Sequence, residues 1–497
     1  MRRLSQLPIH PILLGASLVL NAQVESGVAF QSTLRVWGVL LAVSLLVLAV
    51  WLVATRRPDV AGIGASASMW LLSTRELDRL WLGLVALAAV IASLVVIRRI
   101  ARGRFSLPAV TRAGNLIAGV LLVLTLIRGV ANGSLPAAVA DLTASRTNLA
   151  QPGRPSSAPD IYLVILDGYP RADVLADVTG VDNTPFLNEL DERGFTVAPE
   201  SHSSYMYSDL LGIALFHGRH LVDIPALDPL RAGEARPALG RQVLNRAPLV
   251  ERLRELGYLA IANAPAWDEF TLRNVDVFIE GSGFNEFERH MWWNSLPGSL
   301  MELRGPSVYQ AGIEPWVHDA FEAIGRAAAM EIDRPRFAFI HVPSPHFPIV
   351  FDADGSRADP AFGRDHPDQV VASADEVRAA YAGQIAYLNR TVLETLDEAQ
   401  LPDDAVVILM SDHGPEFGLD WVNADRTDLR TRFGAFFAAR APTGTFAHDA
   451  NVAEALLELL RHRGEVDLPP LEDRFFVTSA VQKLVTMREV GDPWVSD

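Results

Sequence analysis

The chain has 497 residues, of which 49% are hydrophobic, and its formal net charge is −16. A chain this acidic is a poor candidate for nucleic-acid binding, which needs basic surface to neutralise phosphates. It contains no cysteine, so disulfides and thiolate metal sites are excluded and any metal must be held by oxygen and imidazole ligands.

The N-terminal 131 residues contain the candidate membrane spans. Apolar runs lie at about residues 10–30, 36–55, 81–97 and 114–131, and each is close to the roughly 20 residues that cross a bilayer. A weaker fifth candidate covers 58–73, whose Gly and Ser residues are tolerated where helices pack against one another. Hydropathy therefore predicts four or five spans.

The arginines favour five spans over four, because arginines near membrane segments are retained on the cytoplasmic side. They form three clusters: Arg2 and Arg3; Arg56 and Arg57; and Arg98, Arg99, Arg102, Arg104 and Arg112. Five spans place all three clusters on one side, whereas four would put the last cluster opposite the first two. We therefore predict a multi-pass protein of the cell (inner) membrane, with a cytoplasmic N-terminus and a domain outside the cytoplasm.

The part of the chain after the spans is strongly acidic. Residues 1–131 hold 13 Arg and 4 acids, a net charge of +9, which leaves −25 for the remainder. Residues 132–158 are rich in Ala, Ser, Pro and Gly and are predicted to be a linker. Residues 159–497 are then predicted to be one soluble, extracytoplasmic domain.

Strand-like and helix-like segments alternate in this domain. Apolar runs at 160–166, 258–265, 334–341 and 405–410 predict strands, and amphipathic segments at 184–194, 247–257 and 374–400 predict helices. Such alternation indicates an α/β fold with a mostly parallel sheet covered by helices on both faces.

Two of the predicted strands end in residues that can bind a metal. Asp167 follows one strand, and Asp412 and His413 follow another. In open α/β sheets this edge is where ligands bind, so two carboxylates and an imidazole predict one divalent metal ion. Such a donor set admits Zn, Mn, Ca or Mg, of which we favour Zn or Mn. Asp167 alone could instead cap the following turn.

Other polar residues allow two interpretations each. Ser208 begins an apolar helical run, where the helix N-terminus would favour an alkoxide and a bound anion, but an N-cap role accounts for it equally well. Arg171 could bind an anionic substrate or pair with Asp173. A lone histidine near a strand end, such as His341 or His346, is usually structural.

Four segments together resemble the alkaline phosphatase and sulfatase superfamily over residues 159–439. They are "VILDGYPRAD" at Asp167, the segment from Ser208, "FIHVPSPHFP" at residues 339–348, and "YAGQIAYLNRTV" leading to "VVILMSDHG". In sulfatases the nucleophile lies ten residues before a Gly-Arg pair, and counting back from Gly218–Arg219 reaches Ser208. The resemblance implies a metal site of Asp167, Ser208, Asp412 and His413. It also implies that His346 is a catalytic acid and that His341 contacts phosphate.

The chain departs from the sulfatase pattern at several positions, and these departures change the activity that the resemblance implies. The Pro and Arg that direct formylglycine formation are replaced by Leu210 and Gly212, an expected second aspartate is Gly168, and a common aspartate is Asn389. The chain is thus similar to membrane-anchored phosphoethanolamine and phosphoglycerol transferases with one metal. These act on a lipid or envelope-glycan head group through a covalent intermediate, and water as acceptor would make the enzyme a hydrolase. A sulfuric ester hydrolase and a non-catalytic glycan-binding envelope protein are the alternatives.

Overall fold

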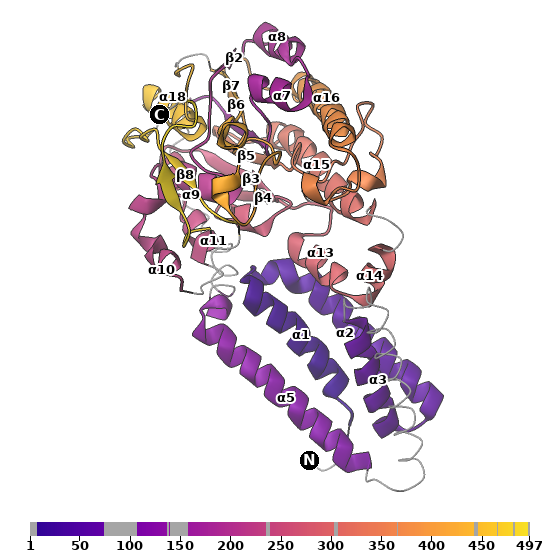
Figure 1. Cartoon of the computed structure of the whole chain (residues 1–497). Helices are drawn as coiled ribbons and strands as arrows, with labels where there is room; N and C mark the ends of the chain where they lie inside the picture. The colour runs from indigo at the N-terminus through magenta and orange to yellow at the C-terminus, as the bar shows by residue number, and fades with distance from the viewer. Residues whose placement is uncertain are drawn as a thin grey trace. The chain divides into compact units, whose positions relative to one another are not determined.

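The computed structural model describes residues 7–73, 107–136, 139, 158–234, 239–302, 307–364, 366–441, 446–464, 466–480 and 483–495. They divide into two compact units (Figure 1). The first unit consists of the N-terminal helices together with residues 284–305, and the second contains the sheet. The predicted span at 81–97 and most of the predicted linker at 132–158 lie outside the described residues.

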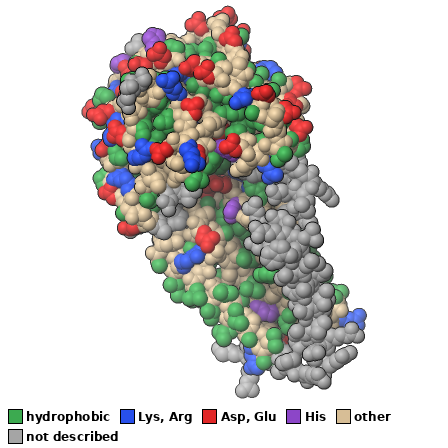
Figure 2. Space-filling view, viewed as in Figure 1, with side chains coloured by type: hydrophobic (Ala, Val, Ile, Leu, Met, Phe, Trp, Pro, Cys, Tyr) green, Lys and Arg blue, Asp and Glu red, His purple; other side chains and the backbone are tan. Residues whose placement is uncertain are grey.

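Four N-terminal helices are described: α1 (His10–Ser26), α2 (Phe30–Thr55), α3 (Pro58–Leu72) and α5 (Leu107–Ala131). Among the described helices, two are long and apolar enough to cross a membrane, at Phe30–Thr55 and Pro108–Ala131. Apolar side chains cover much of the visible surface of these helices (Figure 2). Helices α1 and α3 have 17 and 15 residues and coincide with two further predicted spans.

Helices α1 and α5 run in the same direction. At their starts the backbone N–H of His10 donates to Oδ1 of Asn115 at 2.9 Å, and at their ends Oγ of Ser134 donates to the carbonyl of Val24 at 3.0 Å. Two membrane-crossing helices that run parallel are separated by an odd number of other crossings. The number of spans, one of which is predicted at residues 81–97 outside the described part of the chain, stays a prediction.

The second unit is built on a seven-stranded sheet in the order β2-β7-β6-β1-β5-β3-β4. The strands are β1 (Ile161–Leu166), β2 (Thr196–Val197), β3 (Leu259–Asn263), β4 (Val277–Ile279), β5 (Arg336–Val342), β6 (Val406–Met410) and β7 (Phe437–Arg440). The strands from β6 to β4 pair in parallel, and β7 pairs antiparallel with both of its neighbours, β6 and β2. The mostly parallel sheet predicted from the alternating pattern is confirmed.

Helices cover both faces of the sheet (Figure 1). Ile161, Leu163 and Ile165 of β1 belong to one core cluster, and Tyr162, Val164 and Leu166 belong to another. The first cluster includes α9 (Ser208–His217), α11 (Leu239–Leu244), α12 (Pro248–Glu255) and α18 (Val452–His462); the second includes α7 (Ala172–Thr179), α8 (Thr184–Glu192), α15 (Ser307–Ala328) and α16 (Ala374–Glu398). Every residue of β1 is buried, as expected for a central parallel strand.

Shorter elements complete the second unit. They are α10 (Asp228–Arg231), α17 (Leu429–Phe433) and the antiparallel pair β8 (Phe475–Val477) and β9 (Arg488–Val490). Because β5, β1 and β6 are adjacent and parallel, the residues that follow them meet at one edge of the sheet.

Candidate active site

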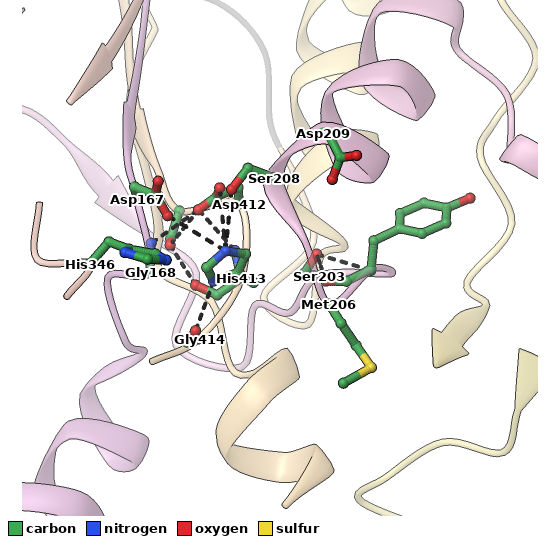
Figure 3. Close-up of polar contacts among 12 residues, drawn as sticks. Asp167, Gly168, Ser203, Met206, Ser208, Asp209, His346, Asp412, His413 and Gly414 are labelled. Atoms are coloured by element: carbon green, nitrogen blue, oxygen red, sulfur yellow. Dashed lines mark hydrogen bonds and ion pairs between the residues drawn. The ribbon is translucent and has the colours of Figure 1, made fainter. Parts of the chain in front are cut away.

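Asp167, Asp412 and His413 come together at this edge. Asp167 follows β1 directly, and the other two follow the neighbouring strand β6. One ligand atom from each lies within 4.8 Å of the others. Nε2 of His413 is 3.5 Å from Oδ1 of Asp167 and 3.6 Å from Oδ2 of Asp412, and all three side chains are buried (Figure 3).

The atoms of this cluster suit a divalent cation. Oδ1 of Asp167 and Oδ2 of Asp412 are buried and have no hydrogen-bond partner among the described residues, which is costly for a carboxylate unless an ion is bound. Nδ1 of His413 lies 2.8 Å from the carbonyl of Gly414. A carbonyl can only accept, so Nδ1 carries the proton and Nε2 presents its lone pair. Burial lowers the pKa of His413 to about 4, which keeps the imidazole neutral.

The two aspartates differ in their affinity for protons. Burial and the neighbouring carboxylate of Asp412 raise the pKa of Asp167. Burial acts in the same direction on Asp412, but His413, His341 and hydrogen bonds outweigh it and lower the pKa of Asp412. One of these bonds is donated by the backbone N–H of Gly168 to Oδ1 at 3.1 Å. A bound cation would replace the proton that Asp167 attracts.

Ser208 is the first residue of α9 and faces this cluster (Figure 3). Its Oγ is 3.3 Å from Nε2 of His413. The N-cap of α9 is Tyr207, without a side-chain capping bond, so the simple capping role for Ser208 is not what the structure shows. Asp209 turns away from the cluster (Figure 3) and binds Nζ of Lys483 at 2.9 Å. Ser208 therefore stands at a helix N-terminus, beside three side chains that could hold a metal ion.

The buried Arg432 links the backbone just before Ser208 to the loop that carries Asp412 and His413. Arg432 is only 1% exposed; its Nε donates to the carbonyl of Met206 at 2.8 Å, and its Nη1 donates to the carbonyl of Gly414 at 2.9 Å. A Cβ at Gly414 would lie 1.9 Å from the carbonyl oxygen of Thr431, so only glycine fits here. Sequence analysis missed Arg432, because nothing in its local sequence separates it from a surface arginine.

His346 lies beside a second residue that sequence analysis missed. Its Nε2 is 3.3 Å from Oε1 of Glu416, and its Nδ1 is 2.6 Å from the carbonyl of Phe347. Burial lowers the pKa of His346, but Glu416 and Asp167 outweigh this effect and raise it, so the imidazolium is favoured. Arg432 also contacts Glu416, at 3.3 Å. Glu416 lies close to Asp412 and His413 in the sequence, and this proximity could have identified it as a candidate site residue.

A search of protein families gives one match that covers more than half of the chain. The family model described as Sulfatase matches residues 159–442. The chain belongs to the sulfatase family. Asp167, Ser208, His346, Asp412 and His413 all lie within the matched residues, so this is an enzyme domain of the sulfatase superfamily with a buried Asp/Asp/His group that fits a metal.

Solved structures of similar fold have low sequence identity to this sulfatase-family chain. The C-terminal periplasmic domain of EcEptC from Escherichia coli has 14% identity and a TM-score of 0.42, covering 70% of this chain and 92% of that one. The phosphonate monoester hydrolase of Agrobacterium radiobacter has 16% identity and a TM-score of 0.41, covering 64% and 79%. The soluble domain of lipooligosaccharide phosphoethanolamine transferase A from Neisseria meningitidis has 12% and 0.38, covering 62% and 90%. No curated protein matches the chain.

His341 lies beside Asp167 of the candidate metal cluster, whereas Arg171 pairs with Asp173. Nε2 of His341 is 3.4 Å from Oδ2 of Asp167, and its fully buried ring has no hydrogen-bond partner. The guanidinium of Arg171 binds Asp173 at 2.6 and 2.8 Å and the carbonyl of Ser201 at 3.1 Å. Of the two interpretations that the sequence allowed for Arg171, the structure shows the pairing with Asp173, and a contact with substrate stays a prediction.

The positions that depart from the sulfatase pattern have structural explanations. A Cβ at Gly212 would lie 2.0 Å from the ring of Phe270, so this helix has no room for the arginine of the formylglycine signal. Asn389 belongs to a closed polar triangle: its Nδ2 donates to Asn183 at 2.9 Å, and its Oδ1 accepts from the hydroxyl of Tyr169 at 2.5 Å. Asn183 in turn donates to Tyr169 at 3.0 Å. Both polar atoms of the Asn389 amide therefore have hydrogen-bond partners, and the residue has a structural role.

Proposed function

We propose that the protein is a membrane-anchored, metal-dependent transferase that moves a phosphoryl-linked head group of a membrane lipid or envelope glycan through a covalent phospho-Ser208. One observation carries the proposal: the Ser208 hydroxyl stands at a helix N-terminus, 3.3 Å from a histidine nitrogen that belongs to a buried cluster of free ligand atoms. A hydroxyl held beside a cation and helix-end N–H groups is an activated nucleophile.

The ion would be held by Asp167, Ser208, Asp412 and His413. One imidazole nitrogen among oxygen donors supports Zn or Mn over Ca or Mg. Such an ion lowers the pKa of a coordinated hydroxyl and stabilises negative charge on a transferred phosphoryl group.

Solvent takes the first proton, from Ser208, and His346 carries the proton that is exchanged in each later step. The Ser208 oxygen, its proton lost to solvent, attacks phosphorus, and the bond from phosphorus to the donor alcohol breaks. His346 gives its Nε2 proton to the departing oxygen. In the second step an acceptor hydroxyl attacks the phosphoserine, the bond to Ser208 breaks, and neutral His346 takes the acceptor's proton. Glu416, 3.3 Å from His346, favours the protonated form with which the cycle begins. Water in the second step would give hydrolysis.

The membrane location supports a lipid-borne donor. Two described helices have the length and apolarity to cross a bilayer, the arginine clusters favour five spans with the N-terminus inside, and α1 is parallel to α5. The catalytic domain would then lie outside the cytoplasm, as part of a multi-pass protein of the inner membrane.

Sulfuric ester hydrolysis is the competing activity, because the family match favours it. The same metal cluster could serve it. The replacement of the modification signal by Leu210 and Gly212, with Phe270 packed where the arginine would stand, argues for an unmodified serine nucleophile and hence for phosphoryl chemistry.

The test is the intact mass of the full-length protein in lipid nanodiscs, incubated with Mn²⁺ or Zn²⁺ and phosphatidylethanolamine or phosphatidylglycerol. We expect an adduct that EDTA and Ser208→Ala abolish and that Ser356→Ala, at an exposed turn serine, leaves unchanged. The mass of the adduct identifies the transferred group. Sulfate-ester turnover without a phosphorus adduct would establish the sulfatase instead, and the absence of both metal and turnover would indicate a binding protein.

A further inference from the structure

The first unit includes a segment from a distant part of the sequence. Helices α13 (Glu286–Trp293) and α14 (Leu296–Glu302) belong to residues 284–305, which group with the N-terminal helices. The chain on either side of this segment, from β4 before it and α15 after it, belongs to the second unit. The polypeptide therefore leaves the sheet domain, contributes to the helical unit and returns.

Specific contacts fasten α13 to the start of α2. Nδ2 of Asn285 donates to the carbonyl of Ser32 at 2.8 Å, and Nε of Arg35 pairs with Oε1 of Glu288 at 2.6 Å. Glu288 is largely buried, and Phe287, 2% exposed, packs into an apolar cluster with residues from the end of α1 and the start of α2. An ion pair, a hydrogen bond and a buried aromatic ring together define one docked position for α13.

These contacts lie at one end of the helical unit. Asn285 and Glu288 bind the first turns of α2, and α14 contacts α3, whose last residue is Leu72. In the five-span arrangement, the end of α1, the start of α2 and the end of α3 all lie on the outer side. The α13–α14 segment therefore lies at the surface of the membrane that faces away from the cytoplasm.

The segment exposes large apolar side chains that its own unit does not cover. Phe284 is 56% exposed, Met301 41% and Trp292 38%. The same unit exposes the apolar surface of α2, with Leu46 at 63%, that a bilayer would cover. Tryptophan is favoured at the boundary between lipid and water because its ring is apolar and its N–H is polar, and clustered exposed apolar residues mark membrane or partner surfaces.

We infer that residues 284–302 form a membrane-interface element that lies in the head-group region of the outer leaflet, with Phe284, Trp292 and Met301 in contact with lipid. The inference rests on the membrane anchoring put forward in the proposed function. The exposed apolar surface of this segment would contact the bilayer, because the segment belongs to the same unit as the helices that the bilayer would surround. The chain then connects the catalytic domain to the membrane unit at both ends of residues 284–305 as well as after α5, which suits a lipid-borne substrate.

The absence of cysteine makes the test direct. Single cysteines replace Phe284, Trp292 or Met301 in the full-length protein, each carries a nitroxide label, and the protein is placed in liposomes of phosphatidylethanolamine and phosphatidylglycerol. Collision rates with oxygen and with a water-soluble nickel chelate report the depth of each label. Leu46→Cys is the lipid control, and Val371→Cys, at a position 88% exposed in the second unit, is the water control.

We expect at least a threefold higher ratio of oxygen to nickel collisions at Trp292→Cys and Met301→Cys than at Val371→Cys, with Phe284→Cys showing the same trend. Ratios equal to the water control at all three sites would overturn the inference while Leu46→Cys still reported lipid. If Leu46→Cys also reported water, the membrane anchoring itself would be wrong, and the two failures are thus distinguishable.

Discussion

The Ser208 hydroxyl lies 3.3 Å from Nε2 of His413, although 205 positions separate the two residues in the chain. The contact arises because α9 begins beside the carboxyl edge of β6 and because Arg432 binds the carbonyls of Met206 and Gly414 together. With Nδ1 of His413 donating to a carbonyl, its free nitrogen and the serine oxygen can share one cation.

Asp167→Asn should abolish stabilisation by metal without harming the metal-free protein. Wild type at a Zn²⁺ or Mn²⁺ concentration 100-fold above Kd should gain about 2.7 kcal/mol of unfolding free energy, and the variant should gain almost none. In EDTA the variant should be at least as stable as wild type, because one of two adjacent buried carboxylates is gone. Thermal unfolding with and without metal measures both effects. The exposed Asp177→Asn is the control, and unchanged metal stabilisation in Asp167→Asn would contradict the site.

His341 should make the metal-free protein sensitive to acid. Burial lowers its pKa from 6.5 to about 4, so between these values the unfolded chain binds a proton that the folded protein does not. The free energy of unfolding should therefore fall as the pH falls from about 6.5 to about 4, by on the order of 1–3 kcal/mol from this residue. Urea unfolding in EDTA at pH 7.5, 6 and 5 should give a flatter profile for His341→Gln; parallel profiles would show that the ring is not buried neutral.

Gly212→Ala should destabilise the protein although alanine is the better helix former. Its Cβ would lie 2.0 Å from Phe270, and overpacking of this kind costs about 1–3 kcal/mol. Gly325→Ala is the matched control, because a Cβ there meets nothing within 4 Å and should stabilise α15 by up to about 1 kcal/mol. Equal effects of the two substitutions in thermal unfolding would show that the helix can shift, and the argument against a sulfatase-type arginine would fail.

Asn389→Asp restores the residue type common in the family but should not create a metal ligand. The change removes the donor to Asn183 and places a carboxylate in a partly buried triangle with Tyr169, at a cost of about 1–3 kcal/mol. Bound metal, measured by elemental analysis, should stay at one ion per chain. Asp397→Asn, which breaks a surface pair with Arg193, should cost no more than about 1 kcal/mol. A second ion bound by Asn389→Asp would refute the structural role of Asn389.

Local sequence patterns were sufficient to predict the three residues of the candidate metal site. Asp167, Asp412 and His413 each follow a continuous apolar run, and such runs become buried parallel strands whose carboxyl ends meet. The alternation of strand-like and helix-like segments was sufficient to predict the mostly parallel sheet. The arginine clusters favoured five spans over four, and this count stays a prediction.

The partners of long side chains were decided by the tertiary structure alone. Arg171 and Arg432 are both buried, but Arg171 pairs with Asp173 and Arg432 with Glu416. No local pattern predicts that both are buried, because burial depends on which distant elements pack around a guanidinium. Gly212 faces Phe270, 58 positions further along, and Asn285 reaches back to Ser32. Hydrophobic periodicity determines strands, helices and the sheet edge, whereas contacts between segments far apart in sequence exist only once the chain has packed.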